Sequence, residues 1–251
     1  MKVSLFADLD NTLIHSHRKQ LTEPKTCVEL LNGKNQSFSL NKLSAYLSKQ
    51  NWMDLIPLTM RTTAQYRRLG PFVQMLGLSR ALVCNGAVLL NGFENDDGWI
   101  ERSKQLISNN YLSFKSMLDD SVGKSVILED PFMFYIKTDK PAEVFNHLKE
   151  LSCSDTVNLY MDSRKVYCLP APLNKGRAVN RILEESPALC IAMGDSEPDI
   201  PMLNESDYAL CPETLYDVVD PRRKKYCCNF RSSDSVIRAL DSIKDEVFRF
   251  D

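Results

Sequence analysis

Three short apolar runs in this 251-residue sequence each end abruptly in polar, oxygen-bearing residues. They are Val3–Ala7 before Asp8, Leu55–Leu58 before Thr59, and Leu189–Met193 before Gly194-Asp195. Nearly continuous apolar runs of this length are typical of strands buried on both faces, as in a parallel sheet covered by helices. Ligands of such sheets collect beyond the carboxyl ends of the strands. The pattern therefore predicts an α/β fold with one site at these three strand ends.

The middle of the chain differs in character from its two ends. Strands alternate with helices before residue 88 and after residue 170, which predicts a doubly wound, Rossmann-like core from residues 1–87 and 171–251. Between them, antiparallel strand pairs and two helices are predicted. The predicted strands are 124–128, 132–136, 157–160 and 166–169, and the predicted helices are 104–118 and 141–151. We therefore expect residues 88–170 to form a smaller, inserted α+β cap.

Two Asn-Gly pairs predict tight hairpin turns, because this dipeptide readily adopts the positive φ angles that such turns need. One would join Cys27–Leu31 to Ser37–Ser39, and the other would join Ala87–Leu90 to Trp99–Ile100. For the first hairpin, residues 27–38, contact with a substrate and contact with a partner remain open. The basic run 222–225 is expected to be a solvated turn, with a polyanion-binding patch as the alternative.

Composition narrows the class of protein. The formal net charge of −2 argues against a nucleic-acid partner, which would call for a basic face. No window approaches the roughly 18 apolar residues of a spanning helix, and no apolar leader precedes the first strand. The eight cysteines contain no Cys-x-x-Cys, and the three histidines complete no zinc pattern. We expect a cytoplasmic protein without a membrane partner, either monomer or homodimer.

The segment Asp8-Leu9-Asp10-Asn11-Thr12 carries the strongest chemical signal. Its two carboxylates would repel each other unless a cation or a proton intervened. Oxygen ligands of this kind suit Mg²⁺. The alternative is an acidic loop that only caps the next turn, since Asp and Asn favour turns.

Three further segments indicate a functional site when they are considered together. In Gly194–Asp199, two aspartates lie four residues apart at a predicted helix start, where a capped N-terminus is the alternative. Thr59 alone would be a turn or cap residue, and Lys175 alone would be a solvated charge. All three lie at or near the ends of predicted core strands or helices. A shared site explains their common placement better than three separate local roles.

The order and spacing of these segments resemble the haloacid dehalogenase-like hydrolase superfamily over nearly the whole chain. Asp8–Thr12 resembles its first motif, with Asn11 where glycine is commoner, Thr59 its second, Lys175 its third, and Gly194–Asp199 its fourth. Asn85-Gly86-Ala87 is similar to a signature of the Cof-type subgroup, which carries a large cap between the second and third motifs. That subgroup includes sucrose-phosphate phosphatase-like enzymes.

The resemblance implies a Mg²⁺-dependent phosphatase that acts on a small phosphorylated metabolite, such as a sugar or polyol phosphate. Asp8 would be the nucleophile that forms an aspartyl phosphate, and Asp10 would be the general acid and base. A second aspartate at position 10 also favours phosphoryl transfer over halide displacement, because the related dehalogenases lack it. The magnesium ligands would be the Asp8 and Asp195 side chains and the Asp10 main-chain carbonyl.

The same resemblance assigns the remaining site residues. Thr59 and the backbone amides near Leu9 would bind the phosphoryl oxygens. Lys175 would bind the substrate and neutralise charge in the transition state. Arg61 and Asn85 would contact the substrate, although Met60 stands where the family commonly has glycine before this arginine. A surface salt bridge is the alternative for Arg61. The supporting residues would be Thr12, Ser196 and Asp199, of which Asp199 would orient Lys175.

Two other functions stay open from the sequence. A phosphomutase would pass the phosphoryl group to a second hydroxyl, and a non-catalytic regulatory module would keep only the fold. The intact Asp8, Asp10, Lys175 and Asp195 argue against the module. Substrate choice should come from the cap, whose aromatic residues are candidates for stacking on a sugar or a base, with core packing as the alternative. They are Trp99, Tyr111, Phe132, Phe134, Tyr135, Tyr160 and Tyr167.

Overall fold

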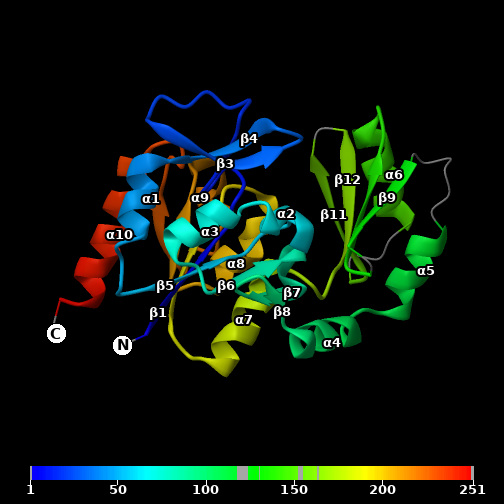
Figure 1. Ribbon diagram of the computed structural model, residues 1–251. Coiled ribbons are helices and arrows are strands. Elements are labelled where there is room, and N and C mark those ends of the chain that lie inside the picture. The colour runs from blue at the N-terminus through cyan, green and yellow to red at the C-terminus, as the bar shows by residue number, and fades with distance from the viewer. Residues whose placement is uncertain (1, 118–123, 130, 152–154, 163, 250–251) are drawn as a thin grey trace.

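A five-stranded parallel sheet forms the centre of the computed structural model, which describes residues 2–117, 124–129, 131–151, 155–162 and 164–249 (Figure 1). Its strand order is β15-β14-β13-β1-β5, and all four neighbouring pairs are parallel. The strands are β1 (Val3–Ala7), β5 (Asp54–Pro57), β13 (Leu189–Met193), β14 (Tyr208–Cys211) and β15 (Lys224–Cys227). The predicted α/β core with a parallel sheet is confirmed.

Strand β1 shows why the sheet is covered on both faces. Leu5 and Ala7 contact one apolar cluster, whereas Phe6 between them contacts another. Helices α1 (Asn41–Leu47), α3 (Gly70–Leu76) and α10 (Ser233–Val247) supply the first cluster, and helices α7 (Lys175–Glu185) and α8 (Ile200–Glu205) supply the second. Both faces of the strand are therefore apolar, which explains its unbroken apolar sequence.

Two small antiparallel sheets border the core. Strands β6 (Arg80–Val83), β7 (Val88–Asn91) and β8 (Glu94–Asn95) form one, next to β5. The other contains β2 (His15–Ser16), β4 (Lys34–Leu40) and β3 (Lys25–Leu31). The turn between β3 and β4 has φ angles of +52° at Asn32 and +73° at Gly33, so the Asn-Gly hairpin predicted here is confirmed.

A four-stranded antiparallel sheet from the middle of the chain lies beside the core, on the right in Figure 1. Its order is β11-β12-β10-β9, and helices α5 (Asn109–Met117) and α6 (Pro141–Leu151) accompany it. Its strands are β9 (Lys124–Glu129), β10 (Met133–Lys137), β11 (Val157–Asp162) and β12 (Lys165–Pro170). This sheet and its helices have an apolar cluster of their own, as an inserted α+β cap should. The boundary at residue 88 stays a prediction, and β7 pairs with β6 on the core side.

The second predicted hairpin is wrong in its outer strand. Trp99 and Ile100 lie in helix α4 (Asp97–Gln105), and β8 takes the place next to β7. Asp96 caps this helix, since its Oδ1 accepts a hydrogen bond of 2.8 Å from the Trp99 N–H. An N-terminal cap thus decided the local structure against the β propensity of the aromatic residue.

Other differences are smaller. The basic run that was expected as a turn continues into the edge strand β15, whose lysines suit an exposed sheet edge. Between β5 and β6 the chain forms two short helices, α2 (Thr63–Arg67) and α3. The helix expected over 104–118 is α5 and the end of α4. The last residue of that predicted helix, 118, lies outside the described residues.

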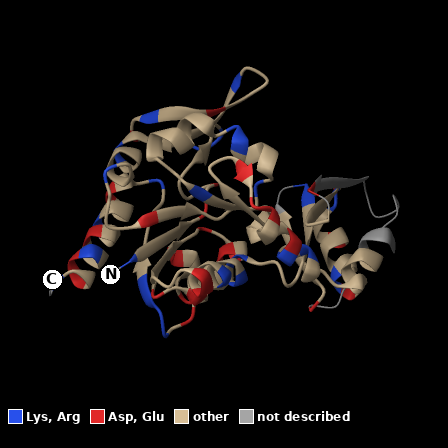
Figure 2. Cartoon of the chain, turned by 60° about the horizontal axis from the view of Figure 1, so that its bottom comes forward, with Lys and Arg blue, Asp and Glu red and all other residues tan. Residues whose placement is uncertain are grey.

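Acidic and basic side chains are interspersed over both the core and the cap sheet with its helices (Figure 2). Within the described residues, no helix combines the length and apolar character that a membrane crossing requires.

Candidate active site

The carboxyl ends of β1, β5 and β13 meet at one edge of the central sheet. Ala7 at the end of β1 is in register with Pro57 on one side and Met193 on the other. The chain then continues in register, because the Asp8 N–H donates to the Met193 carbonyl at 2.9 Å and the Leu58 N–H donates to the Ala7 carbonyl at 2.8 Å. Asp8, Thr59 and Gly194-Asp195 follow directly. The common edge predicted from the three strand ends is present.

Lys175 lies at the centre of this edge, between two aspartates. Its Nζ donates to Oδ1 of Asp8 at 2.7 Å and to Oδ1 of Asp199 at 2.6 Å. The side chains of Lys175 and Asp199 are 1% and 0% exposed. A charge this far from water needs a partner, and both carboxylates supply one. Their attraction outweighs the desolvation that would lower the pKa of Lys175, so its pKa is raised and it stays a cation.

Close packing of helix α7 brings Lys175 to the sheet edge. The helix is capped by Asn174, whose Oδ1 accepts from the Arg177 N–H at 3.0 Å. A Cβ on Gly176 would lie 2.5 Å from the Pro201 carbonyl oxygen of α8. On the other side, Gly86 has a φ of +91°, and a Cβ there would lie 2.4 Å from the Cβ of Ala178. Only residues without a side chain permit both contacts.

Gly176→Ala should therefore move the helix that carries Lys175. The new Cβ meets main-chain atoms of α8, which cannot rotate away, so the two helices must separate. Overpacking of this kind typically costs about 1–3 kcal/mol. We expect urea denaturation to show a loss of unfolding free energy in this range. Exposed Gly98→Ala, where the nearest atom is 3.4 Å from the new Cβ, is the matched control.

Asn85 supports the same helix from behind. It is completely buried, and its Nδ2 donates to the Leu173 carbonyl at 2.9 Å, just before α7 begins. Its φ of +59° places it in the tight turn between β6 and β7. Its side chain does not line the cavity described below, so the structure places it in the packing that positions Lys175 and gives no support to the substrate contact expected from the sequence.

Asp199 organises the loop that follows β13. Its Oδ2 accepts from the backbone N–H groups of Asp195 and Ser196 at 2.9 and 3.0 Å and from the Ser196 hydroxyl at 3.2 Å. Gly194 makes room, because a Cβ there would lie 2.4 Å from the Asp199 Cβ. Both oxygens of Asp199 are thus engaged by donors. This arrangement agrees with the supporting role that the sequence predicted for Asp199 and Ser196.

The donor set at this edge fits a hard divalent cation. One carboxylate oxygen from each of Asp8, Asp195 and Asp199 lies within 4.8 Å of the others. Because the donors described above hold Asp199, the carboxylates of Asp8 and Asp195 are the candidate ligands. Thr12 supports Asp195 through a long hydrogen bond of 3.4 Å to Oδ1. Oxygen-only ligands of this kind suit Mg²⁺.

The pKa values of Asp8 and Asp195 also favour a bound cation. Burial raises the pKa of Asp8 well above its usual value, against the opposing effect of Lys175. Burial, followed by repulsion from Asp199, raises the pKa of Asp195 to about 6. The protein thus gathers more negative charge here than Lys175 balances. A bound cation would offset this excess and keep both carboxylates ionised.

Asp10 lies on the other side of Asp8 and faces the cavity. Its Oδ2 and Oδ1 accept from Nε and Nη2 of Arg61 at 2.7 and 2.8 Å, a bidentate ion pair. Thr59 Oγ1 accepts from the Arg61 backbone N–H at 3.2 Å. The Leu9 side chain is buried in the core, which leaves its main chain between the two aspartates.

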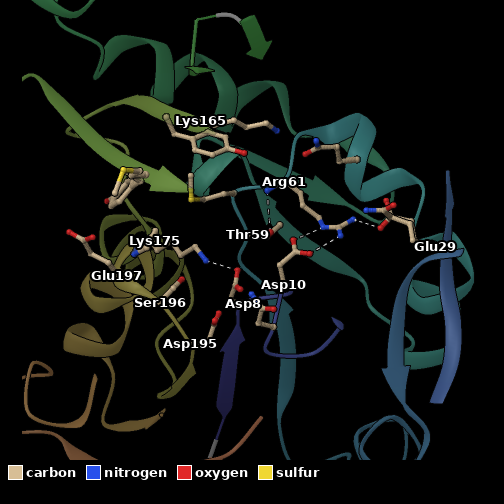
Figure 3. A pocket seen from close by; sticks show the side chains of 18 of the residues that line it. Asp8, Asp10, Glu29, Thr59, Arg61, Lys165, Lys175, Asp195, Ser196 and Glu197 are labelled. Atoms are coloured by element: carbon tan, nitrogen blue, oxygen red, sulfur yellow. Dashed lines mark hydrogen bonds and ion pairs between the residues drawn. The ribbon is translucent and has the colours of Figure 1, made fainter. Parts of the chain in front are cut away.

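A cavity of about 550 Å³ joins these residues to the cap sheet (Figure 3). Asp8, Asp10, Thr59, Arg61, Lys175, Asp195 and Ser196 line it from the core. From the cap, strands β11 and β12 contribute Tyr160, Met161, Lys165 and Tyr167. The cavity therefore brings most of the predicted site residues together with side chains far away in sequence.

Six of the seven cap aromatics divide into two groups. Trp99, Tyr111, Phe132 and Phe134 are buried in apolar clusters, which is the packing role named as the alternative. Tyr160 and Tyr167 line the cavity. Tyr135 belongs to neither group and contacts a cation instead, since Lys165 Nζ lies 4.5 Å from the centroid of its ring.

Sequence reasoning missed Glu29, Arg68 and Lys165 as lining residues. Only Glu29 carried a signal, as a lone charge inside the apolar run Cys27–Leu31. Arg68 and Lys165 belong to segments without any chemical pattern.

Comparisons with known proteins agree with this geometry. The model of the haloacid dehalogenase-like hydrolase family matches residues 90–214, a stretch that contains Lys175 and Asp195. No curated protein matches the chain in sequence. Solved structures resemble it over almost its whole length, at identities that show the fold alone.

The sucrose-phosphatase of Synechocystis, solved with sucrose and phosphate, has 18% identity and a TM-score of 0.66 over 97% of this chain and 99% of its own. A sugar phosphatase of haloacid dehalogenase subclass IIB has 12% identity and a TM-score of 0.66, with coverages of 97% and 99%. A haloacid dehalogenase-like hydrolase from Bacteroides thetaiotaomicron has 15% identity and a TM-score of 0.57, with coverages of 97% and 100%. This chain is thus identified by the family model as a haloacid dehalogenase-like hydrolase over residues 90–214, and the solved structures agree with that family in fold.

Proposed function

We propose that the protein is a Mg²⁺-dependent phosphatase that hydrolyses a small phosphorylated metabolite, with a sugar or polyol phosphate as the expected class. One observation carries the proposal. The buried Lys175 joins Asp8 to Asp199 at the carboxyl end of the sheet, and Asp10 stands beside Asp8 in the cavity. This arrangement supports a nucleophile, an acid and a fixed cation that act in one space.

The proposed reaction uses these positions. A carboxylate oxygen of Asp8 attacks phosphorus while the bond between phosphorus and the leaving oxygen breaks. The leaving oxygen keeps the electron pair and takes a proton from Asp10, which yields the free alcohol and an aspartyl phosphate. A water molecule then attacks phosphorus and gives its proton to Asp10. Phosphate leaves, and the Asp8 carboxylate is restored.

Charge must be balanced throughout, because an anionic carboxylate approaches an anionic phosphate. Lys175 is fixed by Asp199 and holds its positive charge next to Asp8. Thr59 at the end of β5 offers a hydroxyl, and the main chain near Leu9 offers N–H groups to the phosphoryl oxygens. Asp8 and Asp195, with the Asp10 carbonyl, would hold Mg²⁺, which when bound neutralises part of the phosphate charge.

The cavity supports a small substrate. Its volume of about 550 Å³ is in the range of small-molecule pockets. Tyr160 and Tyr167 offer an aromatic surface opposite the catalytic aspartates, and Lys165 offers a cation. Aromatic faces and polar tips of this kind suit a sugar or polyol. The solved neighbours named as a sucrose-phosphatase and a sugar phosphatase support the same class.

Removal of metal should stop the reaction. We expect phosphate release from a panel of sugar and polyol phosphates with Mg²⁺, complete loss after exhaustive treatment with EDTA, and recovery when Mg²⁺ is restored. The physical reason is that without a cation Asp8 and Asp195 repel both each other and the substrate. Phosphate release can be followed colorimetrically. Full activity after chelation would contradict the metal assignment, and no release from any phosphorylated compound would contradict the proposed activity.

The remaining parts of the proposal concern location, assembly and domains. We place the protein in the cytoplasm, and the seven cysteines among the described residues carry free thiols, as a reducing compartment favours. We keep monomer and homodimer as the two candidate states. We also keep residues 88–170 as the cap that selects the substrate.

A further inference from the structure

The hairpin β3–β4 carries a completely buried carboxylate, Glu29, next to the cavity. Its side chain is 0% exposed. Oε1 accepts from Nε of Arg68 at 2.9 Å, while Oε2 accepts from Nη1 of Arg61 at 3.0 Å and from the Ser37 hydroxyl at 2.6 Å. A buried carboxylate is tolerated only with partners of this kind. Nothing in the proposed reaction so far uses this residue.

An irregularity in the hairpin turns Glu29 inward. The register between β3 and β4 shifts on both sides of Glu29, as in a β-bulge. Val28 and Glu29 are therefore both buried although they are neighbours, which the alternation of a regular strand does not allow. Bulges are known to re-aim side chains next to active sites. The hairpin is thus built to direct a carboxylate at the core.

Arg61 connects this carboxylate to Asp10. Nη1 of the guanidinium binds Glu29, and its Nε and Nη2 bind the two oxygens of Asp10 (Figure 3). A planar group held on two edges has little freedom to rotate. The Arg61 side chain is 11% exposed, whereas that of Asp10 is 51% exposed. Arg61 is the fixed member of this pair, and it determines where the more exposed carboxyl lies.

The four charged side chains of Arg68, Glu29, Arg61 and Asp10 form a row in which opposite charges alternate. In the ion-paired form seen here, Glu29 and Asp10 carry two negative charges, and Arg61 and Arg68 carry two positive ones. Asp10 must take up a proton before it can act as the acid. Without Glu29, both arginines would turn to Asp10 and the cavity for an anion. The guanidinium of Arg61 would then lose the contact that sets its orientation toward Asp10.

We propose that Glu29 is a positioning residue for proton transfer, acting from the hairpin through Arg61 on the carboxyl of Asp10. This inference rests on the proposed function. A general acid must lie within hydrogen-bond reach of the leaving oxygen when the bond to phosphorus breaks. An alkyl alcohol is a poor leaving group and needs this proton, whereas nitrophenolate leaves without it. The chemistry of the leaving group therefore distinguishes a positioning role from a purely structural one.

The test compares two substrates in one protein sample with Mg²⁺, namely a hexose phosphate and p-nitrophenyl phosphate. For Glu29→Ala we expect kcat/KM on the hexose phosphate to fall about 10²-fold, within the range that general acid catalysis contributes. On p-nitrophenyl phosphate we expect the loss to stay below about 3-fold, since no proton is needed. The ratio of the two values does not depend on how much of the sample is folded.

Glu29→Gln keeps the shape of the side chain. It tests the positioning role if the alanine variant does not fold. We expect its ratio to change about 10-fold, because the amide keeps one acceptor but loses the charge. Leu30→Ala is the matched control in the same hairpin, since Leu30 is 58% exposed and outside the row. Its ratio should equal that of the wild type. Equal losses on both substrates for the Glu29 variants would overturn the positioning role alone, whereas an inactive wild type would overturn the proposed function as well.

Discussion

Asp8→Asn should lower turnover of any phosphate ester to below about 1% of the wild-type value, since loss of a covalent nucleophile typically costs far more than this. The amide has nearly the same shape but is a poor nucleophile toward phosphorus. Phosphate release at saturating substrate with Mg²⁺ measures the effect. Residual turnover well above that level would exclude Asp8 as the nucleophile.

The fold of this variant should survive, which makes the loss interpretable. Lys175 keeps Asp199 as its charged partner, and the substitution removes a carboxylate whose ionised form is disfavoured by burial. We expect a melting temperature close to that of the wild type. The matched control is Asp54→Asn, at an exposed aspartate outside the cavity that pairs with Arg80 on the surface. Its activity should be unchanged.

Lys175→Met should reduce both activity and stability, because the same side chain serves both. Removal of an electrostatic donor to the transition state typically lowers kcat by about 10²–10³. The change also leaves Asp8 and Asp199 buried without their cation. Breaking a buried pair in this way costs about 3–5 kcal/mol. In a chain of this size the melting temperature should fall on the order of 10 °C.

Calorimetry and kinetics on one preparation separate the two effects. Lys140→Met is the control, because its ion pair with Glu143 is 70% exposed on both sides and should contribute little. A Lys175 variant with wild-type kcat, or with an unchanged melting temperature, would contradict the central position of this lysine.

The segments of the candidate site were predictable because most of them have a local signature. An apolar strand that ends in carboxylates or hydroxyls reports its own burial and the start of a polar loop. Asp8, Thr59 and Asp195 were found in this way, and parallel strands bring such ends together without further information. Lys175 was predictable only from its position relative to the others, because a single lysine before a helix has no pattern of its own.

One error arose where short-range preference and tertiary contact disagreed. Trp99 favours a strand in isolation, but the Asp96 cap begins a helix there. The indole Nε1 of Trp99 then donates to the Gly86 carbonyl at 3.0 Å. Asn85 carried a family signature and was expected at the substrate. Its position behind α7 depends on a residue 88 positions away, Leu173, and no local pattern encodes such a contact.

The sequence alone determined the α/β class, the strands that end at the candidate site and the aspartates proposed to act there, because apolar periodicity and polar strand ends are local properties. Only the tertiary structure decided which side chains contact those aspartates and their partners. Arg61 reaches Asp10 across 51 positions and Glu29 across 32, through a bulge whose register depends on the opposing strand. Such contacts follow from how the hairpin packs on the core, so the balance of charge around Asp10 becomes visible only in three dimensions.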